Sequence, residues 1–253
     1  MNTFNKMTCL ILILLSVSIL PRSLPSYNRI EHPFKIGEFM EFEIKLGNIS
    51  VAILKVWIKG IEKVNDVDCY HIYADIQTVN WVSKIYHLHD KINAYIDKNT
   101  LYSLRIRTLI KEGSWTNQIA IDIDREKKEL HYVDKRKDKI VKYEGEVLGL
   151  VSLIYYARTM VPEKDEKIKF VVSNGDNINY VDTVVKSTDD TQYAPKLKKK
   201  FKTFLYEQIG GKNVALWISK DPYRIPVRMI SVRLKLAGYG IANIEAWITK
   251  FKP

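Results

Sequence analysis

Cysteine is scarce, with two residues in a chain of 253. Cys9 lies in an apolar N-terminal segment, and Cys69 lies in Val67 to Ala74, whose residues alternate as in a strand. If the N-terminal segment is removed, the remaining thiol cannot form an internal disulfide, so the fold must be stable without covalent cross-links. The position of Cys69 in a predicted strand favours a buried, inert thiol over a nucleophile.

Motifs of common enzyme classes are also missing. The sequence has no Gly-x-Ser-x-Gly, no glycine-rich phosphate loop and no His-Glu-x-x-His. Carboxylate pairs such as Asp122 and Asp124 alternate on predicted strands, which is typical of solvated faces. We therefore predict a protein that is not an enzyme and needs no cofactor.

The histidines leave one alternative open. His87 and His89 would share a face of an extended chain and could hold a metal ion through both imidazoles, as in a metal-dependent enzyme. No third ligand follows at an expected spacing. Ordinary polar residues at a strand end are the competing interpretation, and we predict no metal site.

Long apolar runs are absent after residue 26, since none approaches the roughly 20 residues of a membrane helix. Residues 1–26 resemble a secretory signal: Lys6 supplies the positive charge, Met7 to Leu20 is apolar, and prolines and serines follow. Cleavage after Ser23 or Ser26 is expected, and an uncleaved anchor is the alternative. The predicted location is the periplasm or the cell envelope.

The charge is predominantly positive. Removal of Lys6 and Arg22 with the signal lowers the formal charge from +11 to +9. An exported basic protein is not expected to bind nucleic acid. Anionic lipid head groups are the more plausible neighbours, so peripheral contact with a membrane is expected. Solubility alone is the competing explanation of the charge.

The remaining sequence is rich in short alternating segments. Turn signals recur about every 8–12 residues, which is typical of a sandwich or barrel. We predict a single all-β domain over residues 27–253. Its strands are predicted at 39–46, 49–61, 67–78, 89–96, 101–110, 118–124, 129–133, 140–143, 167–172 and 178–186, with a polar loop at 187–192.

The stretch Val214 to Trp247 gives the strongest strand signal. It reads as three strands separated by a turn at Lys220 to Tyr223 and a second turn at Gly238 to Gly240. Alternation places Leu216 and Ile218 on one face of the first strand and Trp217 on the other.

Glu146 to Met160 is the one predicted helix that is apolar almost all round. Leu148, Val151 and Tyr155 recur at helical spacing, and Pro162 follows the end of the segment. A helix with so little polar surface should pack against a sheet. The predicted fold is therefore mainly β: a curved antiparallel sheet, as a half-barrel or open barrel, with one apolar helix on its concave face.

A lysine-rich segment, Lys196 to Ile209, is predicted as a further strand. Its lysines would form one row on strand spacing. Such rows commonly protect an exposed edge from pairing with another chain. Binding of anionic head groups is the alternative, and its candidate residues are Lys198, Lys200 and Lys202, together with Arg105 and Arg107.

Three segments together resemble a known family. They are Gly37-Glu38-Phe39, the helix from Leu148 to Arg158, and the hairpin from Leu216 to Val227. In this order they resemble exported bacterial proteins grouped as domain of unknown function 3108. The hairpin is also similar to those of periplasmic lipoprotein carriers, which fold as a half-barrel with helices in the concave face. That resemblance implies a non-catalytic envelope protein that shelters an acyl chain or docks another envelope component.

Two functions follow as expectations. The first is the binding or carriage of a lipid or another apolar ligand, and the alternative is a structural or assembly module that docks an envelope protein. A curved sheet covered by an apolar helix would leave a hydrophobic interior for the ligand. The candidate cavity residues are Phe42, Trp57, Tyr70, Tyr86, Trp115, Tyr155, Trp217 and Trp247.

Overall fold

The computed structural model describes residues 27–210, 214–236 and 240–253. The predicted signal at 1–26 and most of the predicted turn at 238–240 lie outside these residues. Within them the chain is mainly β, as predicted, with two α-helices and one short 3₁₀ helix. The helices are α2 (Asn80–Ser83), α3 (Leu150–Thr159) and η2 (Pro195–Leu197).

In the described part of the chain, fifteen strands form one sheet in the order β8-β7-β6-β5-β4-β3-β2-β1-β15-β14-β13-β12-β11-β10-β9. Neighbouring strands are antiparallel except for β9 and β10, which are parallel. The strands are β1 (Phe39–Leu46), β2 (Ile49–Val64), β3 (Val67–Thr78), β4 (His89–Asp97), β5 (Ser103–Glu112), β6 (Trp115–Asp124), β7 (Glu129–Val133), β8 (Asp138–Lys142), β9 (Val147–Leu148), β10 (Lys167–Asn174), β11 (Asn177–Ala194), β12 (Lys199–Gln208), β13 (Ala215–Ser219), β14 (Pro226–Leu236) and β15 (Gly240–Lys252).

The first and last described strands along the chain, β1 and β15, pair with each other in the middle of the sheet. β1 runs antiparallel to β15, from the pair Phe39 and Lys252 to the pair Leu46 and Ile244. This pairing joins two meanders, one formed by β1 to β8 and the other by β10 to β15. Apart from this junction, each neighbour in the sheet is also a neighbour in the chain.

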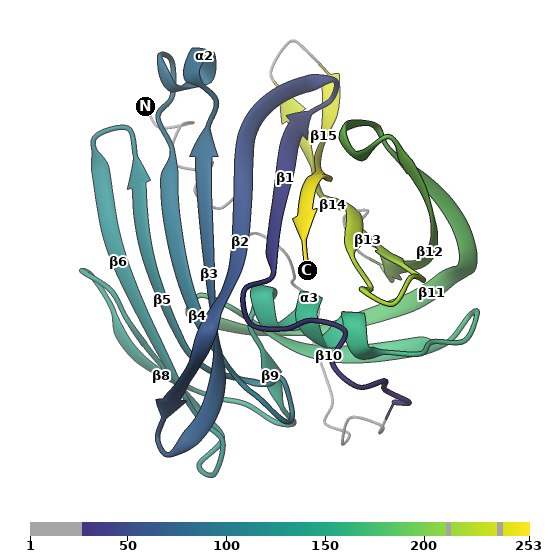
Figure 1. Ribbon diagram of the computed structural model, residues 1–253. Helices are drawn as coiled ribbons and strands as arrows, with labels where there is room; N and C mark the ends of the chain where they lie inside the picture. The colour runs from purple at the N-terminus through teal and green to yellow at the C-terminus, as the bar shows by residue number, and fades with distance from the viewer. Residues whose placement is uncertain (1–26, 211–213, 237–239) are drawn as a thin grey trace.

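The two edges of the sheet, β8 and β9, approach each other without hydrogen bonding as strands. Residues 143–146 are all that separates them in the chain. Side chains close this gap: Ile121 and Leu130 from one end of the sheet share a buried cluster with Val147 and Val171 from the other. The result is the predicted open barrel, whose two halves curve around α3 (Figure 1).

Helix α3 packs on the concave face, as predicted. Its C-terminal residues Tyr155 to Thr159 are all buried. The helix begins at Leu150 rather than at Glu146, because Val147 and Leu148 pair with Val171 and Val172 as the short strand β9. It ends where Met160 adopts an extended conformation, with ψ at 146°.

Two local predictions were wrong. The segment 187–192 is not a loop, since β11 continues through it to Ala194. Its register with β12 shifts between Val185 and Asp190, which is the mark of a bulge, and a bulge accommodates polar residues inside a long strand. The lysine-rich segment is not one strand either: Lys196 lies in η2 and Lys198 is left-handed, with φ at 51°.

Candidate functional site

An apolar cavity of about 120 Å³ lies between α3 and the concave face of the sheet. Leu150, Val151, Ile154 and Tyr155 contribute the helical wall. The sheet wall comes from β1 to β5 and from β14, and consists of Met40, Phe42, Leu54, Val56, Ala74, Ile76, Asp90, Ile92, Thr108, Ile110 and Met229.

Simple periodicity explains this lining. On β1, Met40 and Phe42 are two residues apart and point to the same face. On α3, Leu150, Val151 and Ile154 fall on one side of the helix because they lie within three and four residues of one another. These three side chains are only half-buried, in contrast to the C-terminal turn of the helix. The cavity therefore exposes apolar surface that the fold leaves unfilled.

Asp90 is the charged residue in the lining. It lies two residues before Ile92 on β4, so alternation directs its carboxylate to the apolar face, and it is 9% exposed. Its Oδ1 accepts a hydrogen bond from the Lys111 amide at 3.0 Å. Burial raises the pKa of Asp90 to about 7; the Lys111 amide acts against this rise and the charge of Glu112 adds to it.

A second, smaller cavity of about 80 Å³ lies on the other side of α3. Leu153 and Ala157 form its helical wall, and Leu150 contributes to both cavities. The sheet wall comes from β10 to β13 and includes Tyr206. The Tyr206 hydroxyl is buried and has no hydrogen-bond partner among the described residues. Burial raises the pKa of Tyr206 above its usual value.

A buried ion pair holds the C-terminal end of α3. Arg158 Nη1 and Nη2 donate to Glu38 Oε1 and Oε2 at 2.7 and 2.6 Å. Both side chains are inaccessible to solvent, at 0% and 1% exposure. The two parallel hydrogen bonds satisfy the carboxylate in the geometry that a guanidinium favours.

The same arginine also binds the turn between β13 and β14. Arg158 Nε donates to the Arg224 carbonyl and Nη2 to the Tyr223 carbonyl, both at 3.0 Å. Its guanidinium lies over the rings of Phe34 and Tyr155, at 5.0 and 4.9 Å from their centroids. Arg158, Glu38 and the turn carbonyls come from the three segments that carry the family resemblance. Those segments thus meet at a single structural contact, which we call the Arg158 latch.

The predicted cavity residues fall into separate places. Phe42 and Tyr155 line the larger cavity. Tyr70 is buried in the same core against Phe34 but lines neither cavity. The Tyr86 hydroxyl donates a hydrogen bond to Glu112 Oε2 at 2.7 Å. Trp115 begins β6 and is 42% exposed.

The other three tryptophans lie on the outer face of the sheet. Trp57 alternates with buried Val56 and Ile58 and has Lys59 over its ring. Trp217 and Trp247 sandwich the guanidinium of Arg228, at 4.7 and 4.6 Å from their centroids. These tryptophans therefore do not line the cavity. Their apolar area is covered from outside by cationic side chains, an arrangement that sequence alternation allowed but composition did not suggest.

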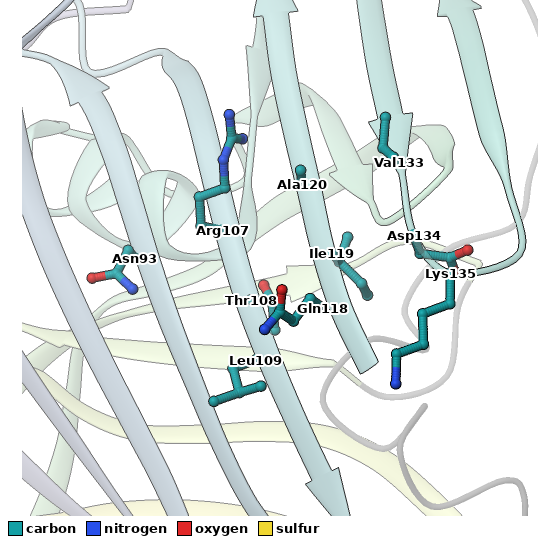
Figure 2. A pocket seen from close by; sticks show the side chains of 10 residues that line it. All are labelled: Asn93, Arg107, Thr108, Leu109, Gln118, Ile119, Ala120, Val133, Asp134 and Lys135. Atoms are coloured by element: carbon teal, nitrogen blue, oxygen red, sulfur yellow. The ribbon is translucent and has the colours of Figure 1, made fainter. Parts of the chain in front are cut away.

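The basic candidates also lie away from the cavity. Arg105 Nε and Arg107 Nη2 both donate to Asp122, at 2.7 and 2.6 Å. Arg107 lines an open groove of about 470 Å³ across β4 to β7, where its guanidinium and the Lys135 amino group point in different directions (Figure 2). The groove does not present a shared cationic site, because Lys135 Nζ already donates to the Thr116 carbonyl.

The candidate lysines do not make one row. Lys198 is the left-handed residue that connects η2 to β12. Lys200 and Lys202 are exposed on β12, and Lys202 Nζ lies 3.1 Å from Asp189 Oδ2.

His87 and His89 do not converge on a shared ligand site. His89 Nε2 lies 3.1 Å from Asp75 Oδ2, whereas His87 is exposed. In the part of the chain that the structure describes, no three His, Cys, Asp or Glu side chains are grouped as metal ligands. Across the same residues, no helix is long and apolar enough to span a membrane.

Asp90 and Tyr206 were missed as site residues. Asp90 is in phase with Ile92, Ala94 and Ile96, so its place on an apolar face was readable from alternation. Tyr206 is likewise in phase with buried Phe204. The Arg158 latch also had a signal, namely an arginine inside an almost fully apolar helix. Its partner Glu38 lies 120 residues away, and no local pattern identifies a partner at that distance.

Comparison with known proteins places the fold. A crystal structure from Brucella abortus, described as a β-barrel-like protein of domain of unknown function DUF1849, aligns with a TM-score of 0.54 at 10% identity. The alignment covers 86% of this chain and 97% of that one. At this identity the likeness shows the fold alone, and it agrees with the open barrel described above.

No curated protein matches the sequence. Residues 41–236 match the sequence model of a family described as a protein of unknown function, DUF3108. The match spans most of the sheet from β1 to β14 and includes α3. It agrees with the resemblance carried by the helix and the β13–β14 hairpin. The chain therefore belongs to the DUF3108 family.

Proposed function

We propose that this protein is a non-catalytic envelope protein that binds a lipid or another ligand with a hydrocarbon chain between α3 and the sheet. The observation that carries the proposal is the apolar cavity beside a half-buried helix face. A cavity with apolar walls gives a hydrocarbon ligand about 0.8 kcal/mol for each CH₂ that it buries.

The size of the cavity limits what it holds. Its volume of about 120 Å³ is below that of an engineered apolar cavity of about 150 Å³ that binds benzene. It therefore receives a segment of a chain rather than a whole lipid, and the rest of the ligand would extend along the half-buried residues of α3. The smaller cavity on the other side of the helix shares Leu150 and offers a continuation.

The location of the protein is part of the proposal. Residues 1–26 have the pattern of a secretory signal, and export would bring the protein to membrane lipids. Exposed basic residues such as Lys200 would then favour contact with anionic head groups.

Native mass spectrometry tests the binding. The mature chain is purified without detergent, incubated with 1-octanol and compared with the variants Ala74→Leu and Ala120→Leu. Ala74 lines the cavity and is buried, so a leucine there adds three carbon atoms to the space that a ligand would occupy. Ala120 lines the outer groove and is the matched control.

We expect bound octanol on the wild type and on Ala120→Leu, and at least tenfold weaker binding to Ala74→Leu. Far-ultraviolet circular dichroism verifies that both variants are folded. Bare masses for all three proteins across the soluble range of octanol would contradict the proposal. Equal binding to both variants would place the ligand elsewhere.

A docking role has weaker support. The edge strand β8 leaves backbone groups unpaired along one side, and Ile140 on it is 59% exposed. However, Lys139 and Lys142 are on the same strand, and lysines on an edge oppose pairing with another chain. A stable cross-linked complex that Ile140→Lys abolishes would favour this role over ligand binding.

A further inference from the structure

The larger cavity is apolar at every wall except near one strand position. Asp90 is its charged lining residue, and Thr108 on the neighbouring strand and Tyr155 on α3 each carry a hydroxyl. The Tyr155 hydroxyl already donates to Glu38. A hydrocarbon chain makes no hydrogen bond to a carboxylate, and burying a carboxylate without a partner costs several kcal/mol. The presence of Asp90 therefore needs an explanation beyond the binding of an apolar chain.

The hydrogen bonds of Asp90 leave one oxygen available. Oδ1 accepts from the Lys111 amide at 3.0 Å, whereas no hydrogen bond from another described residue reaches Oδ2. The residue is 9% exposed and borders the cavity. Above its pKa of about 7, a carboxylate oxygen at the wall of a cavity can accept a hydrogen bond from a donor group that enters.

The charges around Asp90 determine whether an anionic polar group is disfavoured at this position in the cavity. Glu112, on the adjacent strand β5, is close enough to raise the pKa of Asp90 and accepts the hydroxyl hydrogen of Tyr86. The Lys111 amide is the donor that acts against this rise. Two acidic side chains on neighbouring strands produce a negative potential at this end of the cavity.

We propose that Asp90 binds the polar end of the ligand, and that the ligand is an amphiphile whose polar end donates hydrogen bonds, an amine or a hydroxyl, rather than a free carboxylate. The inference rests on the proposed function and adds the chemistry of the head group. A donor supplies the partner that Oδ2 lacks. An anionic head group would face both Asp90 and Glu112.

The selectivity can be measured with three probes of one chain length. Octylamine, 1-octanol and octanoate are titrated into the wild type by isothermal titration calorimetry at pH 8, where octanoate is ionised. Octylamine and octanol are expected to bind, and octanoate to bind at least tenfold more weakly than octylamine. In Asp90→Asn, which retains an oxygen for the Lys111 amide, octylamine is expected to lose about tenfold in affinity, equivalent to about 1.4 kcal/mol.

The matched control is Asp68→Asn. Asp68 is exposed and pairs with Lys63, so its neutralisation changes the net charge by the same amount without touching the cavity. It is expected to leave all three affinities unchanged. Equal loss of octylamine affinity in both variants would reduce the effect to net charge and overturn the proposal.

The outcomes separate this inference from the proposed function. If no probe binds the wild type, the cavity does not take alkyl chains and both fail. If all three probes bind with equal affinity, and Asp90→Asn changes none of them, ligand binding stands and the role of Asp90 is overturned. If Asp90→Asn does not fold, the ranking of the probes on the wild type still decides, since octanoate binding as tightly as octylamine is incompatible with an acidic anchor.

Discussion

The two halves of α3 are held in contrasting ways. Its C-terminal half is fully buried and fixed by the Arg158 latch. Its N-terminal half presents Leu150, Val151 and Ile154 half-buried to a cavity. One helix thus combines a rigid attachment with a wall that is still free to contact a ligand.

The residues that carry the family resemblance and the residues that line the candidate site therefore lie at different ends of α3. The segments by which the chain resembles its family converge on the latch, where they stabilise the fold. The candidate binding surface lies one to two helical turns away and is composed of ordinary aliphatic residues. A motif search alone would therefore direct attention to the structural end of the helix.

The largest effect is expected from removing the charge of Glu38, which disrupts the Arg158 latch at the buried end of α3. Glu38→Gln leaves Arg158 buried without its counter-ion, which is expected to lower the free energy of unfolding by about 3–5 kcal/mol. Urea denaturation followed by circular dichroism measures the change. Glu62→Gln, which alters an acid that is 51% exposed beside His71, should cost less than about 0.5 kcal/mol.

A companion double variant sharpens the result. Glu38→Leu combined with Arg158→Met replaces the ion pair by apolar side chains and should recover much of the loss. If the double variant is as unstable as Glu38→Gln, then the contacts of Arg158 with the Tyr223 and Arg224 carbonyls stabilise the protein more than the ion pair does.

At the cavity, the second prediction concerns how the free energy of unfolding depends on pH through Asp90. Its pKa is about 7 in the folded protein and about 4 in an unfolded chain, so between these values the folded state binds the extra proton. Stability from this group is consequently present at low pH and is lost as pH rises towards 7. The slope is at most about 1.4 kcal/mol per pH unit, so a difference of about three pKa units gives a total loss of up to about 4 kcal/mol.

Asp90→Asn should remove this contribution. The difference in urea midpoint between wild type and variant is expected to shift in favour of the variant as pH is raised from 4 to 7. A difference that stays constant over this range would show that the carboxyl does not retain its proton in the folded state.

A third variant examines how α3 begins. Gly149 precedes the helix, and its amide donates to buried Ser103 Oγ at 2.8 Å. A Cβ at this position would lie 2.7 Å from Ile106 Cδ1, so Gly149→Ala must displace a flexible side-chain end at a cost of about 1–2 kcal/mol. Thermal unfolding measures it. Gly60→Ala on β2 meets no atom within 4 Å and should change stability by less than about 0.5 kcal/mol.

The smallest expected effect is at Tyr206. Its buried hydroxyl has no partner among the described residues, so Tyr206→Phe should be neutral or stabilise the fold by up to about 1 kcal/mol. Urea denaturation of the variant checks this. A loss of more than about 1 kcal/mol would indicate that a water or ligand normally satisfies the hydroxyl.

Strand alternation predicted much of the fold. The bounds of β1, β3 and β7 agree with the predicted 39–46, 67–78 and 129–133, since in each the apolar residues recur with period two between clear turns. The helix on the concave face was also predicted, because so apolar a segment has to be covered. The prediction of a loop at 187–192 was wrong, because a strand that contains a bulge can continue through polar residues without an apolar face.

The candidate site was less predictable for a physical reason. Alternation divides a strand into two faces but does not say which face becomes concave. Trp217 and Trp247 were assigned to the interior by their hydrophobicity, yet Arg228 between them stabilises both on the outside. The cavity itself depends on the pairing of β1 with β15 and on the distant partner of Arg158, neither of which has a local signal.

The pairing of β1 with β15 has a consequence for how the molecule is made. Strands β1 to β8 can pair with their neighbours in the chain, but the other side of β1 pairs only with β15, some two hundred residues downstream. Contacts of such long range slow folding, because the intervening chain must be ordered before they form. Without β15, both β1 and β14 would have one unpaired side in the middle of the sheet, so the addition of β15 joins the two meanders into one sheet.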